Sequence, residues 1–194
     1  MNVRPCGDAA VLLDCESLDE ARRWYTAVRD RADAVLGART VLLRGEPAAL
    51  GALVATTVPA AIPADTAVRD VEIPVSYDGP DLEAVARHTS LTMREVVEAH
   101  TGTPWQVAFA GFSPGFAYLV GGDARLSVPR RVTPRTAVPS GSVALAGGFS
   151  AVYPRDSPGG WQLIGRTATA MWDLGRNPPA LLVPGVRVRF VEMS

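Results

Sequence analysis

A serine-hydrolase motif stands near the middle of the chain, where Gly111, Ser113 and Gly115 fit the pattern G-x-S-x-G. In hydrolases this pattern forms a strained turn that exposes a nucleophilic serine, and the next residue donates its backbone N–H to the oxyanion. Here the next residue is Pro114, which has no N–H and which biases Ser113 toward an extended conformation. A catalytic histidine should also follow the serine, but both histidines precede it. The sequence therefore predicts a proline-stiffened loop rather than a nucleophile.

The chain contains no lysine, and all 19 of its basic residues are arginine. This excludes a P-loop lysine, a Schiff-base lysine and a lysine that carries covalent biotin or lipoate. Residues 160–167 resemble a phosphate-binding loop with arginine in place of lysine, but the interior WQLI is bulky, so we interpret the segment as a strand. Two cysteines and two histidines are too few for a typical transition-metal site, and we expect none.

Charge is unevenly distributed along the chain. From Thr101 onward nine arginines face four acidic residues, a balance of +5, whereas residues 1–100 carry ten arginines and 16 acidic residues, a balance of −6. This asymmetry predicts that the second half binds an anion or docks on an acidic partner. The alternative is that the arginines only solubilise a β-rich surface. The net charge of −1 argues against a nucleic-acid partner.

One histidine is a candidate for proton transfer. Thr92 and Glu95 form a capping box that begins a helix, Val96 and Val97 belong to its apolar face, and His100 follows at the next turn. A histidine on the inner face of a helix is most often structural. This helix ends just before the strand and loop that carry the serine motif, however, so His100 is also a candidate general acid or base.

The first segment of the chain is predicted to be a small α/β unit. Strands are expected over Ala9–Leu13 and Thr40–Leu43. Between them a helix begins at a capping box formed by Ser17 and Glu20, and a second helix begins at Pro47. Alternation of strand and helix is typical of helices packed on one sheet.

A domain boundary is expected soon after this unit. Val58–Ala67 has the composition of a linker, and Val71–Val75 is a strand that Pro74 should confine to a sheet edge. We therefore divide the chain into an N-terminal α/β lobe, residues 1–73, and a β-rich domain with two short helices at its start, residues 74–194.

From Trp105 onward the pattern changes to short strands separated by glycine-rich turns, as in GGD, SGS, AGG, SPGG and VPG. Many short strands spaced in this way predict a closed β-barrel or a sandwich. The expected strands are Trp105–Ala110, Phe116–Val120, Ser142–Ala146, Ala151–Tyr153, Trp161–Ile164 and Val186–Val191.

Composition indicates a globular protein, because 47% of the residues are hydrophobic and low-complexity tracts are absent. No apolar run reaches membrane-spanning length, and the N-terminal residues lack the apolar segment of a signal peptide. Cys6 and Cys15 are isolated thiols, which fits a reducing compartment. We expect a cytoplasmic protein.

Four motifs, in this order, resemble one known family: GFSPGFAYL, VPRRVTPRTAVPSGSVALAGG, SPGGWQLIGRT and PALLVPGVRVRF. The family contains the 5-oxoprolinase B subunit, the kinase inhibitor KipI and allophanate hydrolase subunit 1, and it is similar to one half of the carboxyltransferase region of urea carboxylase. The resemblance extends from about Asp81 to Phe190 and is weak over the first 70 residues. It implies an α+β fold, in which a small N-terminal α/β lobe precedes a cyclophilin-like β-barrel.

The resemblance also implies a function and partners. The chain would be part of an ATP-dependent hydrolase that opens 5-oxoproline to glutamate. It would work in a hetero-oligomer with a carboxyltransferase-like C subunit and with a lactam-hydrolysing A subunit. Two alternatives stay open: a carboxyltransferase subunit of the allophanate hydrolase or urea carboxylase type, and a KipI-like inhibitor of a histidine kinase.

An enzyme of this sort must hold phosphate and carboxylate groups, which suit the planar fork of arginine. On that reading, His100 is the candidate proton shuttle. The candidate anion-binding residues are Arg130, Arg131, Arg135 and Arg166. The residues expected to frame the site are Phe112, Pro114, Gly115, Phe116, Ser142, Gly159 and Gly160.

Overall fold

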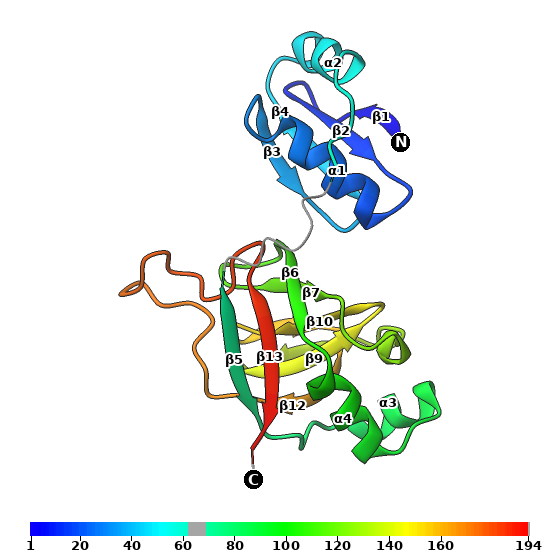
Figure 1. Cartoon of the computed structure of the whole chain (residues 1–194), viewed down its shortest axis with the longest axis vertical. Helices are drawn as coiled ribbons and strands as arrows, with labels where there is room; N and C mark the ends of the chain where they lie inside the picture. The colour runs from blue at the N-terminus through cyan, green and yellow to red at the C-terminus, as the bar shows by residue number, and fades with distance from the viewer. Residues whose placement is uncertain (62–68, 194) are drawn as a thin grey trace. The chain divides into compact units, whose positions relative to one another are not determined.

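The computed structural model describes residues 1–61 and 69–193 of the chain. These residues form two compact units, one on each side of residues 62–68, and each unit has its own sheet (Figure 1). The expected linker, Val58–Ala67, lies largely outside the described residues. The two units are considered separately below.

The first unit is a four-stranded antiparallel sheet, in the order β1-β2-β4-β3, with two helices. Two of its strands, β2 and β4, agree with the strands expected from the sequence. The sequence analysis does not predict β1 or β3, because β1 is exposed throughout and the apolar run of β3, Ala34–Leu36, is only three residues long. The elements are β1 (Asn2–Pro5), β2 (Ala10–Asp14), α1 (Leu18–Val28), β3 (Asp33–Leu36), β4 (Thr40–Arg44) and α2 (Pro47–Ala55).

Both helices of the first unit begin where the capping residues predict. The Ser17 hydroxyl accepts the backbone N–H of Glu20 at 3.1 Å and starts α1. The Glu20 carboxylate accepts the N–H of Glu16 instead of that of Ser17, so only half of the expected capping box forms. In α2, Pro47 occupies the first turn and Glu46 is the N-cap.

Seven strands form the main sheet of the second unit, in the order β12-β9-β10-β7-β6-β13-β5 (Figure 1). Neighbouring strands are antiparallel except for β13 and β5, which run parallel. All six strands expected after residue 105 are present, with ends shifted by at most two residues. The bounds are β5 (Asp70–Val75), β6 (Trp105–Ala110), β7 (Ala117–Val120), β9 (Ser142–Ala146), β10 (Phe149–Val152), β12 (Gln162–Arg166) and β13 (Arg187–Glu192).

The two edges of this sheet meet, which makes it a nearly closed barrel. Ser76, just after β5, and Arg166, at the end of β12, exchange two backbone hydrogen bonds of 2.9 Å each. The contact continues where the N–H of Gly79 donates to the carbonyl of Ile164 at 3.2 Å. A Cβ on Gly79 would lie 2.3 Å from the backbone carbon of Ile164, so this approach requires glycine. The expected α+β class, with a barrel after a small α/β lobe, is confirmed.

The strand β5 is the last in the sheet order, as the proline at position 74 predicts. It pairs with β13 over its whole length, from Asp70 opposite Arg187 to Val75 opposite Glu192. Residues 70–73 therefore belong to the second unit, and the boundary expected after residue 73 falls inside a strand.

Two short helices follow β5, as expected: α3 (Leu82–Thr89) and α4 (Met93–Gly102). Both halves of the capping box formed by Thr92 and Glu95 are present. The helix α3 contacts β12, and α4 contacts β13. None of the helices in the described part of the chain is both long and apolar enough to cross a membrane.

A separate two-stranded ribbon consists of β8 (Arg135–Val138) and β11 (Ser157–Gly159), and a 3-10 turn, η1, covers Ala124–Leu126. The sequence analysis does not predict the ribbon, because proline and glycine interrupt both of its strands or their ends. The ribbon lies beside a hydrophobic cluster that contains Phe116 and Trp161 and is distinct from the main core of the barrel.

Candidate functional site

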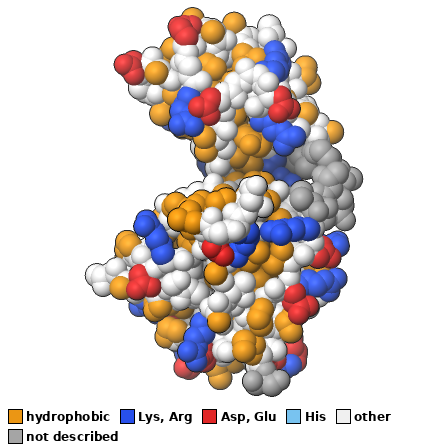
Figure 2. All heavy atoms as spheres, turned by 90° about the vertical axis from the view of Figure 1, so that its left-hand side faces the viewer, with side chains coloured by type: hydrophobic (Ala, Val, Ile, Leu, Met, Phe, Trp, Pro, Cys, Tyr) orange, Lys and Arg blue, Asp and Glu red, His pale blue; other side chains and the backbone are white. Residues whose placement is uncertain are grey.

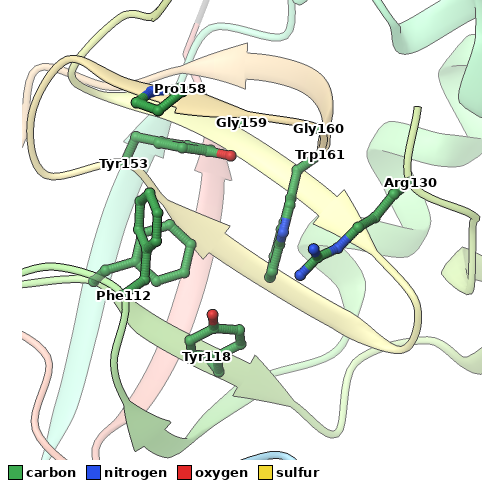
Figure 3. Close-up of a pocket in the computed structure, with 9 residues that line it drawn as sticks. Phe112, Tyr118, Arg130, Tyr153, Pro158, Gly159, Gly160 and Trp161 are labelled. Carbon is green, nitrogen blue, oxygen red and sulfur yellow. The ribbon is translucent and has the colours of Figure 1, made fainter. Parts of the chain in front are cut away.

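The second unit contains a small pocket of about 90 Å³ with aromatic walls (Figure 3). It lies between the β6–β7 turn, strand β7, the segment just after η1 and the end of β11 with the start of β12. Its lining consists of five aromatic side chains, one arginine and a Pro-Gly-Gly segment: Phe112, Phe116, Tyr118, Tyr153, Trp161, Arg130, Pro158, Gly159 and Gly160.

The β6–β7 turn places Phe112 at the rim of the pocket. Phe112 has a φ of +70°, and the N–H of Ser113 donates to the carbonyl of Gly111 at 2.8 Å, which makes a γ-turn centred on Phe112. A bulky residue in this conformation is strained. The turn nevertheless places this large apolar side chain, which is 59% exposed, beside the pocket.

The serine of the G-x-S-x-G motif does not line this pocket. The Ser113 hydroxyl is buried and has no hydrogen-bond partner among the described residues, so no base activates it. Pro114 is exposed, and Gly115, with a φ of +83°, packs against the Cβ of Trp172. The expectation that this motif forms a loop instead of a nucleophile elbow agrees with this geometry.

The base of the pocket is a rigid set of aromatic rings. The ring centre of Phe116 lies 5.1 Å from Tyr118, 5.3 Å from Tyr153 and 5.6 Å from Trp161, each in an edge-to-face arrangement. Tyr118 and Trp161 are also 5.6 Å apart. Rings that contact one another on several sides cannot change rotamer independently, so the pocket is preformed.

The hydroxyls of Tyr118 and Tyr153 are the uncharged hydrogen-bond donors of the aromatic pocket. Burial raises the pKa of Tyr118 and of Tyr153, while the positive charge of Arg130 opposes the increase at both. The two side chains are therefore neutral phenols at physiological pH and can donate hydrogen bonds. The Tyr153 hydroxyl lies so close to Gly159 that a Cβ there would be 2.3 Å away, which makes glycine necessary in this wall.

Arg130 is the cation of the pocket, and its guanidinium lies beside Trp161 and Tyr118 (Figure 3). It forms no hydrogen bond or ion pair with residues 1–61 or 69–193. An unpaired guanidinium against aromatic rings is available to bind a planar anion such as a carboxylate. The pocket can therefore bind a small molecule with one negative charge and a flat apolar body.

Arg131 and Arg135, two of the predicted anion-binding residues, contact a protein carboxylate. Both donate to the same oxygen of Asp81, Oδ1, at 2.8 Å, and the other oxygen accepts the N–H of Leu163 at 2.7 Å. The Asp81 side chain is only 4% exposed. Burial alone would raise the pKa of Asp81, but the hydrogen bonds from Arg135 and Leu163 outweigh it and keep the pKa below its usual value.

A second pocket, of about 320 Å³, contains Arg135, Arg166 and Ser142 in its lining. Both of its arginines pair with protein carboxylates, although Nη1 of Arg135 is buried without a partner among the described residues. Arg166 pairs with Asp78 at 2.8 Å, and the Ser142 hydroxyl donates to the carbonyl of Pro139 at 2.7 Å. The predicted anion-binding arginines are thus divided between two pockets and the Asp81 cluster, and only Arg130 is unpaired among them.

His100 is fully buried and lines neither pocket. Its Nδ1 is hydrogen-bonded to the Tyr77 hydroxyl at 2.7 Å, its Nε2 to the Ser150 hydroxyl at 2.9 Å, and its ring stacks on Phe190 with centres 4.3 Å apart. Burial lowers the pKa of His100 to about 3. The candidate role as a proton shuttle is not supported, because both nitrogens are occupied and no reactant can reach the ring.

The structure brings part of the predicted site together and adds residues that the sequence analysis does not select. Phe112, Phe116, Gly159 and Gly160 line the aromatic pocket with Arg130, as the framing role requires. Three further aromatic residues of the pocket fit the spacing of strands, so the sequence alone assigns them to strands or to the core. They are Tyr118, Tyr153 and Trp161.

No group of three or more His, Cys, Asp or Glu side chains within the described ranges is arranged to hold a metal ion. The aromatic pocket likewise offers one guanidinium and two phenols, but no carboxylate, imidazole or thiol in its lining. These groups can bind and orient an anion, whereas a strong base or nucleophile would have to come from outside this lining.

Comparison with known proteins identifies relatives of this chain. It is 48% identical over 129 residues to the 5-oxoprolinase B subunit of Escherichia coli O157:H7, a match that covers 65% of this chain and 59% of that relative. It is 41% identical over 66 residues to urea amidolyase of Lachancea kluyveri, covering 31% of this chain and 4% of the relative. The chain thus spans less than two thirds of the length of these relatives.

A solved structure has the same fold. The conserved uncharacterized protein PH0987 from Pyrococcus horikoshii is 31% identical and matches all of this chain and 98% of its own length, with a TM-score of 0.63. The sequence profile described as "Carboxyltransferase domain, subdomain C and D" matches residues 1–182. With a match over nearly the whole chain, this protein belongs to the family of carboxyltransferase domains, subdomains C and D.

Proposed function

We propose that the chain is one component of an ATP-dependent 5-oxoprolinase, in which 5-oxoproline, ATP and two water molecules give glutamate, ADP and phosphate. The relative from Escherichia coli carries the name of a 5-oxoprolinase component, its B subunit, which supports this assignment. The observation that carries the proposal is the unpaired guanidinium of Arg130 in a preformed aromatic pocket.

The chemistry of the pocket matches that of 5-oxoproline, a flat five-membered lactam with one carboxylate. The carboxylate would bind Arg130, and the ring would lie against Phe116 and Trp161. The hydroxyls of Tyr118 and Tyr153 are neutral donors that can bind the lactam carbonyl oxygen. ATP would activate this oxygen by phosphorylation, and the nucleotide would be held by the complex as a whole.

The reaction requires groups that the aromatic pocket does not supply. Hydrolysis of an activated lactam needs a base to deprotonate water, and no carboxylate or imidazole lies in the described lining. We therefore propose that a carboxyltransferase-like partner, the C subunit, completes the site, and that a lactam-hydrolysing A subunit takes part in the full complex. Alone, this chain would bind substrate without turning it over.

The rim of the pocket offers a surface for this partner. Phe112 is 59% exposed, and Trp172 and Leu174, on the loop between β12 and β13, are 40% and 83% exposed. Trp172 packs against Gly115 of the β6–β7 turn, so the loop and the turn are adjacent. Figure 2 views the side of the molecule from which this loop projects and shows hydrophobic side chains next to arginines on the second unit. Exposed aromatic side chains beside a site are typical anchors of a protein interface.

Reconstitution tests the proposal. The chain should co-purify with the carboxyltransferase-like partner, and the complete set of subunits should release phosphate and glutamate only when 5-oxoproline and ATP are both present. A complex assembled with Arg130→Met should remain intact and lose most of its turnover at low 5-oxoproline concentration. Assembly of the full set without any ATP turnover on 5-oxoproline would refute the proposal.

A second candidate is a carboxyltransferase component that acts on a urea-derived substrate. The match to urea amidolyase and the family description favour this alternative. We place this candidate second because the match to urea amidolyase covers 31% of this chain, whereas the match to the 5-oxoprolinase B subunit covers 65%. Supplying urea with bicarbonate, ATP and a biotin-carrying partner in place of 5-oxoproline distinguishes the two candidates.

A further inference from the structure

Arg130 has no partner of its own among the described residues, but the residues on both sides of it are fixed. The carbonyl of Pro129 accepts the side-chain Nε2 of Gln162 at 3.1 Å, and the N–H of Arg131 donates to the carbonyl of Gly160 at 2.7 Å. Gly160 and Gln162 flank Trp161, whose side chain lines the pocket beside Arg130 (Figure 3). The backbone at Arg130 therefore runs alongside this segment and is attached to it before and after the arginine.

Asp81 strengthens this attachment from outside the pocket. Its carboxylate binds the side chains of Arg131 and Arg135, which stand at the two ends of a five-residue segment, and it also binds the N–H of Leu163 in β12. Asp81 itself is fixed, because its own N–H donates to the carbonyl of Leu163 at 2.9 Å. The segment that carries Arg130 is thus attached, through Asp81, to β12 at the place where the two edges of the sheet meet.

The charges of Asp81, Arg131 and Arg135 also favour the attachment of this segment to β12. Two guanidinium groups share one carboxylate, and Arg131 Nε and Arg135 Nη1 are buried without a partner among the described residues. These three side chains together retain a net positive charge, and Arg131 is adjacent in sequence to Arg130 of the aromatic pocket. Asp81 pairs with Arg131 and Arg135 outside the pocket, and Arg130 is the one guanidinium in the described lining.

We propose that Asp81 is a positioning residue, which fixes the guanidinium of Arg130 for a ligand with a single carboxylate by clamping residues 129–135 to β12. Gln162 is the second clamp, at Pro129. The ligand class rests on the proposed function, whereas the clamp itself concerns only the free protein. Neither side chain appears in the lining of the aromatic pocket, so both act through Arg130.

The first experiment needs no ligand. Side-chain ¹⁵Nε relaxation of Arg130 is measured in the wild-type protein, in Asp81→Asn and in Glu83→Gln, a control that neutralises an exposed carboxylate paired with Arg87 nearby on α3. We expect Asp81→Asn to make Arg130 markedly more mobile and Glu83→Gln to leave it unchanged. Unchanged mobility of Arg130 in folded Asp81→Asn overturns the proposal. If Asp81→Asn does not fold, Gln162→Leu removes the other clamp without changing charge, and the same criterion applies to it.

The second experiment uses 5-oxoproline as the probe in a double-mutant cycle. We expect Asp81→Asn to weaken 5-oxoproline binding about tenfold when Arg130 is present and less than about twofold in the Arg130→Met background. Equal weakening in both backgrounds shows a general effect on the fold and overturns the positioning role. If the wild-type complex does not bind 5-oxoproline at all, the proposed substrate is wrong, and the relaxation measurement alone decides the clamp.

Discussion

Two regions of the second unit each contain a residue that the sequence offers for chemistry, and they differ in what remains free. Around His100 both ring nitrogens are hydrogen-bonded and the side chain is inaccessible. Around Arg130 the guanidinium has no partner in the described residues and faces a preformed pocket. A group can act on a reactant only if it is accessible and has bonding capacity left, so we place the candidate site at the arginine and not at the histidine.

The two regions also differ in what their residues contribute to stability. The neutral imidazole of His100 joins α4 to the Tyr77 and Ser150 hydroxyls inside the core, where an unpaired polar group is costly. The side chain of Arg130 makes no hydrogen bond with the described residues. The residues on either side of it are bonded instead, Arg131 to Asp81 and Pro129 to Gln162. Substitutions at the first region should therefore change unfolding, and those at the second should change binding.

The largest effect is expected from His100→Ala. The change leaves the Tyr77 and Ser150 hydroxyls without partners and opens a cavity beside Phe190, which should cost about 3–5 kcal/mol of unfolding free energy. Urea unfolding measures this cost. The fraction that stays folded should bind 5-oxoproline as the wild type does. Lost binding at full stability would reverse the comparison and make His100 functional.

The pH dependence of the unfolding free energy should also report on His100. Because burial lowers the pKa of folded His100 from 6.5 to about 3, the unfolded chain binds a proton in this range that the folded protein does not. Its contribution to stability is complete above pH 6.5 and is lost as the pH falls toward 3, at up to about 1.4 kcal/mol per pH unit. Urea midpoints measured across this range should fall steeply in the wild type and less steeply in His100→Gln. Parallel slopes would contradict the assignment of a buried neutral imidazole.

A substitution in the pocket wall should give an intermediate effect. In Gly159→Ala the new methyl would lie 2.3 Å from the Tyr153 hydroxyl, so the ring must move, at a cost of about 1–3 kcal/mol and with loss of pocket shape. Gly148→Ala is the matched control, because nothing lies within 4 Å of its Cβ position. Thermal unfolding and 5-oxoproline titration of both variants test the difference. Equal behaviour would mean that the wall adapts and the pocket is not preformed.

Arg130→Met should change ligand affinity more than it changes stability. We expect unfolding free energy to change by less than about 0.5 kcal/mol and 5-oxoproline affinity to fall about tenfold or more, because one charge-assisted hydrogen-bond donor is lost. The control is Arg87→Met on the exposed face of α3. Calorimetric titration checks the affinities. A strong loss of stability without loss of affinity would place Arg130 with the structural residues.

The smallest effect is expected at the rim, in Phe112→Gly. Relief of the strained φ of +70° offsets the greater freedom of the unfolded chain, so stability should change by less than about 1 kcal/mol. Phe116→Ala, at the base of the same pocket, should cost about 3 kcal/mol or more. Comparing the unfolding midpoints of the two variants separates rim from base. A large loss in Phe112→Gly would show that the rim is part of the core.

Much of the fold is visible in local patterns. The capping residues Ser17 and Thr92 mark the starts of helices, and alternation of apolar residues marks the buried strands. The strands β1 and β3 and the ribbon of β8 and β11 lack such a pattern, because hydrogen bonds to neighbouring strands form them and each buries at most one apolar side chain. The pairing of β5 with β13 joins residues more than a hundred positions apart, and no local signal encodes it.

For the site, the sequence by itself determined which residue types are present: arginines without lysine, a proline after Ser113 that argues against a serine nucleophile, and motifs that resemble one family. Only the tertiary structure decided which arginine is free. Asp81 is about fifty residues from Arg131 and Arg135, yet it neutralises part of their charge, while the neighbouring Arg130 receives no counter-ion from the described residues. Accessibility and pairing depend on contacts between distant segments once the barrel closes, and those contacts are properties of the fold rather than of any single stretch of sequence.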